Sequence, residues 1–216
     1  MNQKEKYNFL INYFEKAIPV AESELEFRSP YELLVAVILS AQCTDKRVNM
    51  ITPAFFEQFP DAEILSQAIQ DAVYEKIKSC SYPNNKAKNL LGMARMLTTE
   101  FKGIVPDSVE DLQKLPGVGR KTANVVASVI YNKPAMAVDT HVFRVSNRIG
   151  LAKNAKTPLE VEKQLMKIFH ESIVPKAHHW LILHGRYMCK ARKPMCEQCG
   201  LTAICEYFRK NNHISL

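Results

Sequence analysis

One turn in the middle of the chain reads Leu115-Pro116-Gly117-Val118-Gly119-Arg120-Lys121-Thr122-Ala123, and we expect helices on both sides of it, at about 108–114 and 120–131. Gly117 and Gly119 permit a tight turn and leave room for another backbone to approach, because glycine has no Cβ. The second helix begins with unpaired N–H groups and the positive end of its dipole, which together suit an anion. The turn therefore predicts a phosphate site or, on a plainer interpretation, a helix–turn–helix corner with glycine as its hinge.

The segments around this turn carry helix signals. Residues 29–32 (Ser-Pro-Tyr-Glu) read as a capping box with proline at the first helical position, and residues 107–110 and 157–160 repeat the cap pattern. Residues 33–39 are apolar on every face, so we expect a central buried helix there. With no convincing strand or repeat, the sequence predicts an all-α fold.

Two further helices are expected near the ends of the chain. Residues 4–16 form an amphipathic pattern, and a helix from about 177 through 187 leads into a group of cysteines. The longest apolar stretch is too short to span a bilayer. Because the first ten residues lack a signal-peptide pattern, we expect an untargeted, cytoplasmic protein.

The composition is that of a folded protein with a basic end. The chain has 216 residues, 47% hydrophobic and 24% charged, which excludes a disordered chain. It carries 29 basic and 22 acidic residues, a formal net charge of +7. Seven of the basic residues and two of the acidic ones lie between Lys176 and Leu216. This excess indicates a polyanionic partner, nucleic acid or an anionic membrane, or simply a soluble basic surface.

Four of the six cysteines (Cys189, Cys196, Cys199 and Cys205) form a C-x6-C-x2-C-x5-C pattern near the C-terminus. Without a secretory signal, a metal is a better explanation than disulfides. A structural zinc site usually has two short cysteine pairs, whereas one compact loop suits a four-thiolate iron–sulfur cluster. Cluster, zinc and unliganded thiols remain the alternatives from spacing alone. Cys43 and Cys80 are expected to be core residues.

Together these motifs resemble the helix–hairpin–helix superfamily of base-excision DNA glycosylases. The turn matches its hairpin, Val138-Asp139-Thr140-His141-Val142-Phe143-Arg144-Val145 resembles its acidic motif, and the cysteine pattern matches its iron–sulfur branch, the endonuclease III family. The resemblance extends from about Ser29, including residues 39–42 and 44–45, to Cys205.

The resemblance implies two helical lobes with a DNA-binding cleft between them. One lobe is a helical barrel domain at 23–135 that contains the helix–hairpin–helix. The other combines residues 1–22 with 136–216 and carries one [4Fe-4S] cluster on the four cysteines. The implied substrate is double-stranded DNA with damaged pyrimidines or abasic sites. The protein is expected to be a monomer that works at the nucleoid and does not bind membranes.

The implied activity is a bifunctional DNA N-glycosylase and AP lyase that removes oxidised pyrimidines and nicks the strand by β-elimination. Lys121 stands at the family's catalytic lysine, and Asp139 at its catalytic aspartate. The dipole end of the helix and the adjacent Arg120 both favour a neutral Lys121 amine, which can attack C1′ and form a Schiff base. The plainer interpretations are a solvated lysine and an aspartate that only caps a helix.

A flipped base leaves a gap in the duplex that the protein must fill. By similarity we assign this role to Gln42 and to the loop at 81–87, where Tyr82 replaces the expected aliphatic residue and Ser81 the expected glycine. The loop cations are expected to contact phosphates. The full set of predicted DNA contacts is Gln42, Tyr82, Leu115, Pro116, Gly117, Val118, Gly119, Arg120, Arg186, Lys190, Arg192 and Lys193.

Three rival interpretations fit less well. The adenine-mismatch branch of the superfamily lacks a lysine at the position of Lys121 and has a further C-terminal domain. A hairpin module that only binds DNA needs neither Lys121 nor Asp139. A membrane-surface protein would need a basic amphipathic helix, which the sequence lacks.

Overall fold

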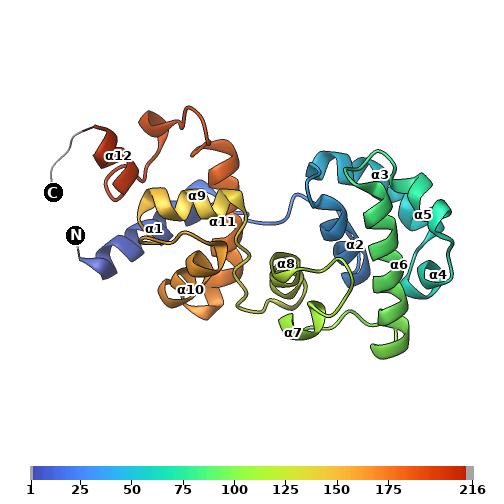
Figure 1. Ribbon diagram of the computed structural model, residues 1–216. Coiled ribbons are helices and arrows are strands. Elements are labelled where there is room, and N and C mark those ends of the chain that lie inside the picture. Colours follow the sequence, from blue (N-terminus) through green and yellow to red (C-terminus); the bar gives the residue numbers. More distant parts are fainter. Residues whose placement is uncertain (1, 213–216) are drawn as a thin grey trace. The chain divides into compact units, whose positions relative to one another are not determined.

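The computed structural model describes residues 2–212, and within this range it is all-helical, without strands (Figure 1). The all-α prediction is therefore confirmed. The chain divides into two compact units: a contiguous unit, Ser23–Asn132, and a discontinuous unit, Met1–Glu22 with Lys133–Leu216. No helix among the described residues has both the length and the hydrophobicity that crossing a membrane requires.

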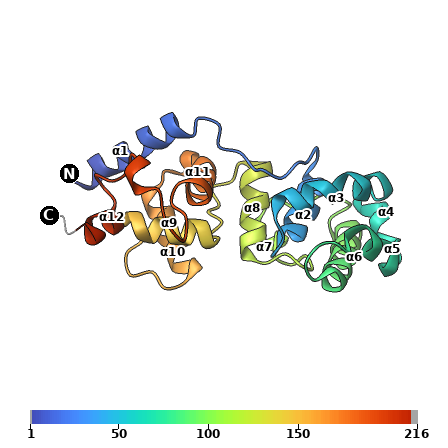
Figure 2. The ribbon, with the colours of Figure 1, turned by 90° about the horizontal axis from the view of Figure 1, so that it is seen from above.

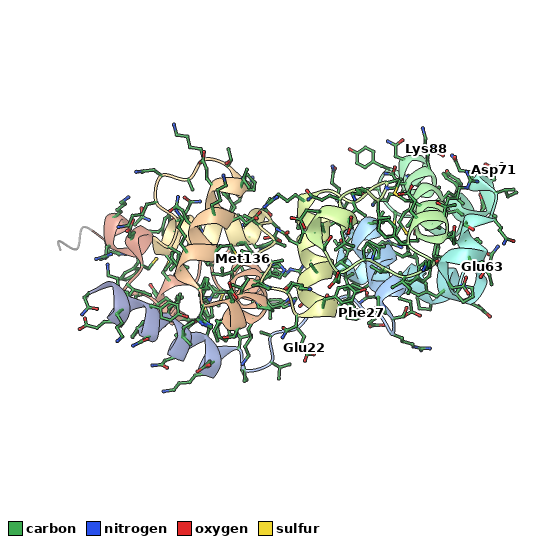
Figure 3. The ribbon with its side chains drawn as sticks, turned by 90° about the horizontal axis from the view of Figure 1, so that it is seen from below. Glu22, Phe27, Glu63, Asp71, Lys88 and Met136 are labelled. Atoms are coloured by element: carbon green, nitrogen blue, oxygen red, sulfur yellow. The ribbon has the colours of Figure 1, made fainter. Side chains whose placement is uncertain are left out.

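The contiguous unit is built around one buried helix. Its helices are α2 Pro30–Ser40, α3 Asp45–Gln58, α4 Ala62–Ser66, α5 Gln70–Ile77, α6 Pro83–Glu100, α7 Val109–Leu112 and α8 Arg120–Tyr131. As expected, residues 33–39 are all buried, and α2 packs against α3, α6 and α8. The outer helices are amphipathic instead, and they present Glu63, Asp71 and Lys88 to solvent (Figure 3).

The discontinuous unit joins the two ends of the chain. Its helices are α1 Gln3–Ala17, α9 Thr140–Ile149, α10 Pro158–Ile168, α11 Val174–Tyr187 and α12 Glu206–Asn211, with short 3-10 turns at Glu171–Ile173 and Cys196–Gln198. Helix α1 lies along the C-terminal helices of this unit (Figure 2). Phe14 of α1 stacks on the buried Trp180 of α11 at 5.5 Å, and Trp180 Nε1 donates to Ile18 O at 3.0 Å. Met136 is fully buried in the same core (Figure 3).

Helix starts agree with the sequence patterns, with local corrections. Thr157 forms the predicted capping box. Ser29 caps α2, but the Glu32 carboxylate accepts from the N–H of Arg28 at 2.6 Å, one residue before the position that a capping box uses. In 107–110 the cap is Ser108, which accepts from Asp111 N–H. Helix α11 starts at Val174 and not at about 177, because a proline in its first turn suits a helix start.

Candidate functional site

The turn between α7 and α8 is held against α6 by close contacts at two glycines. Gly117 has a φ of +81°, and a Cβ there would lie 2.8 Å from the Cβ of Asn89. A Cβ on Gly92 would lie 3.1 Å from Cγ of Pro116. Gly117 is therefore required both by the way that the turn packs on α6 and by its backbone conformation, while Gly92 leaves Pro116 a close fit against α6.

Gly119, in contrast, has no such internal requirement. Its φ is −83°, and among the described residues a Cβ on Gly119 would meet nothing within 4 Å. It is the N-cap of α8, and within residues 2–212 no side chain caps this end. A bare backbone at an N-cap leaves the first N–H groups of the helix open to an anion that approaches from outside.

Two other residues of the turn face inward. Leu115 and Val118 are buried, and the Val118 N–H donates to Leu115 O at 3.0 Å. Their side chains stabilise the turn from within, so any contact that they make with a ligand can use only the backbone.

Lys121 is exposed in the first turn of α8, beside the exposed Arg120. Ala123 and Asn124, a short way further along α8, are buried. The amphipathic pattern of α8 therefore places the Lys121 amine outside the core, where a ligand at the turn can reach it.

Gln42 and Tyr82 occupy two exposed loops with the same unusual backbone. Both residues have a φ of +56°, in the left-handed region, and the Tyr82 side chain is 62% exposed. Non-glycine residues adopt this conformation rarely, and such residues are concentrated at functional sites.

Polar contacts bring the two loops together within the contiguous unit. Ser81 Oγ donates to Gln42 O at 2.7 Å. The ammonium of Lys86, a buried residue, donates to Leu39 O at 2.7 Å and Ala41 O at 2.8 Å, at the C-terminal end of α2. Burial lowers the pKa of Lys86, and these carbonyls satisfy the desolvated ammonium. The structure thus places the two loops that carry the predicted gap-filling residues next to each other, and the hydrogen bonds of Ser81 and Lys86 stabilise them.

Asp139 is the N-cap of α9. Its Oδ1 accepts from the Val142 N–H at 2.8 Å, and Val138 and Val142 are buried on either side. The capping role considered from the sequence is therefore present. The hydrogen bond to Oδ1 fixes the carboxylate in position, which is compatible with a chemical role for Asp139.

Arg144 joins the start of α9 to the cysteine segment. Its Nη2 donates to Gly185 O at 2.8 Å and lies 3.2 Å from Nδ1 of His141, while its Nε donates to Cys189 O at 3.0 Å. A Cβ on Gly185 would lie 2.7 Å from the Cβ of His141, so α9 and α11 pack closely at this point. The helix that begins with Asp139 is thus linked directly to the first cysteine.

Arg148, one turn further along α9, fixes the residues after Cys189. Its two Nη groups donate to Lys190 O at 2.7 Å and to Ala191 O at 2.9 Å. Its guanidinium also lies 4.5 Å from the ring centre of Tyr207. Sequence reasoning assigned no role to either arginine. Their spacing of four on one face of the helix after Asp139 is the signal that could have indicated it.

All four cysteines of the C-x6-C-x2-C-x5-C pattern line one cavity, together with residues that include Met188, Leu201 and Phe208. The thiols are close enough to affect one another. Burial raises the pKa of Cys199 and Cys205, and charge on neighbouring cysteines raises it further. Four convergent sulfurs in an apolar surround are the donor set of an iron–sulfur cluster, whose positive irons would stabilise the thiolates. No group of three or more His, Cys, Asp or Glu residues in the described range is arranged to hold a single metal ion.

The predicted phosphate-contacting cations differ in their exposure. Lys190, Arg192 and Lys193 are exposed in the loop that Arg148 holds. Arg186 is half-buried on α11, and burial lowers its pKa from the usual value. The loop cations are accessible to a polyanion, whereas Arg186 is partly enclosed.

The predicted residues fall into two groups. The contiguous unit holds the glycine turn, Lys121, Gln42 and Tyr82, and the discontinuous unit holds Asp139 and the cysteine loop. Sequence segments far apart, residues 40–43 and 80–86, meet in the first group, and α9 meets the cysteine segment in the second.

A family model and several known proteins match this chain. A family model described as HhH-GPD superfamily base excision DNA repair protein matches residues 35–171. The chain is 46% identical to Endonuclease III of Rickettsia felis over 206 residues, which cover 95% of this chain and 96% of that protein. It is 42% identical to Endonuclease III of Bacillus subtilis over 208 residues, 96% of this chain and 95% of that protein.

Solved structures give the same result. The fold matches a trapped Endonuclease III–DNA covalent intermediate with a TM-score of 0.91 and 42% identity, over 98% of this chain and 99% of that chain. A thermostable thymine-DNA glycosylase matches with a TM-score of 0.84 and 24% identity, over 96% and 97% of the two chains, which shows a shared fold.

Proposed function

Because the chain belongs to the endonuclease III family of HhH-GPD base excision DNA repair proteins, we propose that Lys121 and Asp139 carry out its DNA glycosylase and AP lyase reactions. The observation that carries this assignment is the position of Lys121, exposed in the first turn of α8 directly after the glycine turn. A 42% identical relative was captured as a covalent intermediate with DNA, which requires a nucleophile on the protein.

Lys121 acts as the nucleophile. Its amine attacks C1′ of the damaged nucleotide, and the N-glycosidic bond breaks. The oxidised pyrimidine leaves with the bonding electrons and takes up a proton, which balances the proton that Nζ loses. Opening of the sugar ring gives a Schiff base between Nζ and C1′. Loss of a proton from C2′ then expels the 3′ phosphate by β-elimination, and water hydrolyses the Schiff base to release the enzyme.

Asp139 supplies the negative charge that this chemistry needs. The transition state for loss of the base has oxocarbenium character, and a fixed carboxylate stabilises developing positive charge without reorganising. The hydrogen bond from Val142 N–H fixes Oδ1, so the cap serves as the support of a catalytic group.

The glycine turn binds a phosphate without reading bases. The N–H groups at the start of α8 bind the anion, and the missing Cβ of Gly119 lets it come close. Gln42 and Tyr82 fill the space that the flipped nucleotide leaves, with Tyr82 stacking on a neighbouring base. The chain's relatives are bacterial Endonuclease III proteins, and we assign this protein the same setting: a monomer in the cytoplasm that acts on double-stranded DNA at the nucleoid.

Cys189, Cys196, Cys199 and Cys205 hold one [4Fe-4S] cluster. With these four thiolates bound to one cluster, the loop between Cys189 and Cys196 would be held at both ends, and Lys190, Arg192 and Lys193 would form a rigid phosphate-contacting surface. The visible absorption spectrum of the purified protein tests this assignment, because a colourless zinc protein would contradict it.

Borohydride trapping on abasic DNA tests the role of Lys121. Lys121→Gln removes the amine, so no covalent complex should form and strand nicking should fall to background. The matched control is Lys163→Gln, the same change at an exposed lysine on α10. Full trapping by Lys121→Gln would refute the assignment, whereas loss in both variants would point to a general effect of removing a lysine.

A further inference from the structure

Two cysteines outside the C-terminal loop lie against each other in the contiguous unit. Cys43 Sγ and Cys80 Sγ are 3.7 Å apart although the residues are 37 apart in sequence. Cys80 is buried, 4% exposed, and Cys43 is partly accessible. They were expected to be core residues, but only Cys80 is.

Each cysteine adjoins one of the two loops that we assign to gap filling. Cys43 directly follows Gln42, and its N–H donates to Ser40 O at 3.0 Å at the end of α2. Cys80 comes two residues before Tyr82, and its N–H donates to Ile77 O at 2.8 Å at the end of α5. The two sulfurs therefore lie where the loops leave the preceding helices. Ser81 already joins the loops through its hydrogen bond to Gln42 O.

The sulfurs need only a small movement to bond. A disulfide has an S–S distance of about 2.05 Å, so the two sulfurs must approach each other by about 1.7 Å. Burial raises the pKa of Cys80 to about 11, while the positive charges of Lys86 and Arg47 act in the opposite direction. The more accessible Cys43 is the sulfur that an oxidant from solvent meets first.

We propose that Cys43 and Cys80 form a reversible, peroxide-driven disulfide that fixes the loops of Gln42 and Tyr82 and thereby weakens DNA binding. The Cys43 thiolate attacks one peroxide oxygen, giving a sulfenic acid and hydroxide. The Cys80 sulfur then attacks Cys43 Sγ and expels a second hydroxide. With the two thiol protons, the products are one disulfide and two waters, and a dithiol reductant restores both thiols.

The effect on DNA rests on the proposed function of the two loops. A disulfide would draw the two loops together at Cys43 and Cys80. This displaces Gln42 and Tyr82 and removes their freedom to adjust to the gap in the duplex. Because the stacking of an aromatic ring such as Tyr82 on a base contributes directly to affinity, we expect its loss to weaken DNA binding about tenfold.

The test uses the holoprotein treated with hydrogen peroxide at levels that leave its visible absorption unchanged. After free thiols are alkylated, trypsin should release residues 29–46 joined to residues 79–86, lighter by two hydrogens and separated by dithiothreitol. Cys43→Ser and Cys80→Ala should each abolish the joined peptide. Affinity for a duplex with an uncleavable abasic-site analogue is measured for oxidised, reduced and doubly substituted protein.

The expected result is the joined peptide in wild-type protein and weaker DNA binding that only this form shows and that reduction reverses. Absence of the joined peptide, or cross-links only between molecules, overturns the disulfide site. A joined peptide with unchanged affinity overturns the regulation. Borohydride trapping by the reduced protein tests the proposed function separately, because peptide joining does not depend on DNA.

Discussion

The glycine turn and the cysteine loop are both assigned to phosphate binding, but they are built in opposite ways. The turn at 115–119 offers backbone N–H groups and is shaped by what a Cβ would meet. The loop after Cys189 offers three exposed cations, and its backbone is held by Arg144 and Arg148 from α9. One surface depends on the absence of side chains, and the other depends on side chains from a distant segment.

This difference predicts different responses to substitution. A backbone site is sensitive to single atoms and carries no charge of its own, so its binding should depend little on salt. A cationic loop should tolerate single losses but respond strongly to ionic strength.

Asp139→Asn should have the largest effect. Asparagine caps a helix about as well as aspartate, so the free energy of unfolding should hardly change. Loss of the charge should lower the rate of base excision by about 10²- to 10⁴-fold. Single-turnover kinetics and thermal unfolding measure the two quantities.

Asp139→Ala provides the control, because it removes both the charge and the cap. It should lose activity to the same extent and also lose about 1 kcal/mol of stability. If Asp139→Asn retained full activity, the residue would only be a cap.

Alanine substitutions at three glycines separate folding from binding in the turn. Gly117→Ala should cost about 2–3 kcal/mol of stability, because it combines a positive φ with a clash against Asn89. Gly103→Ala should cost about 1 kcal/mol, since that glycine has a φ of +76° but open space around its Cβ. Gly119→Ala should cost less than about 1 kcal/mol of stability, since alanine is a poorer N-cap than glycine, and it should weaken DNA binding. Normal DNA affinity for Gly119→Ala would contradict the backbone anion site.

Mild acid should destabilise the discontinuous unit selectively. All six histidines lie in that unit's sequence, and burial lowers the pKa of His179 to about 4. An unfolded histidine binds a proton below about pH 6.5, whereas folded His179 stays neutral, so stability falls as pH drops from about 6.5 to 4. The loss attributable to His179 should be about 2 kcal/mol at pH 5.

Hydrogen exchange can measure this loss for each unit, and the contiguous unit serves as the internal control. His179→Gln should remove its part of the acid sensitivity. An equal acid response of both units over this pH range would show that histidine burial is not the cause.

Substitution of Lys190, Arg192 and Lys193 by glutamine should have the smallest effect on DNA affinity per residue. It should change the salt dependence of binding most clearly. Each lost phosphate contact should reduce the slope of log affinity against log salt by about 0.9, up to about 2.7 for all three. Gly119→Ala should weaken binding without changing that slope. If the triple variant kept the wild-type slope, the loop cations would not contact phosphates.

The sequence alone determined much of the local structure. The buried helix at 33–39 follows from seven consecutive apolar residues, and the start of α9 at Asp139 follows from a capping side chain before a helical pattern. The glycine turn and the cysteine spacing were equally visible, since these signals depend on neighbours along the chain. The start of α11 was misplaced by three residues because the proline signal there was not used.

Only the tertiary structure decided which distant residues meet. Ser81 and Gln42, Cys43 and Cys80, and Arg148 with the carbonyls after Cys189 are separated by 37 to 43 positions. It also decided which of two similar glycines the fold requires: Gly117 packs on Asn89, whereas Gly119 meets nothing among the described residues. Such contacts depend on how helices pack against one another. A single sequence predicts the helices from local patterns but does not show which helices will be in contact.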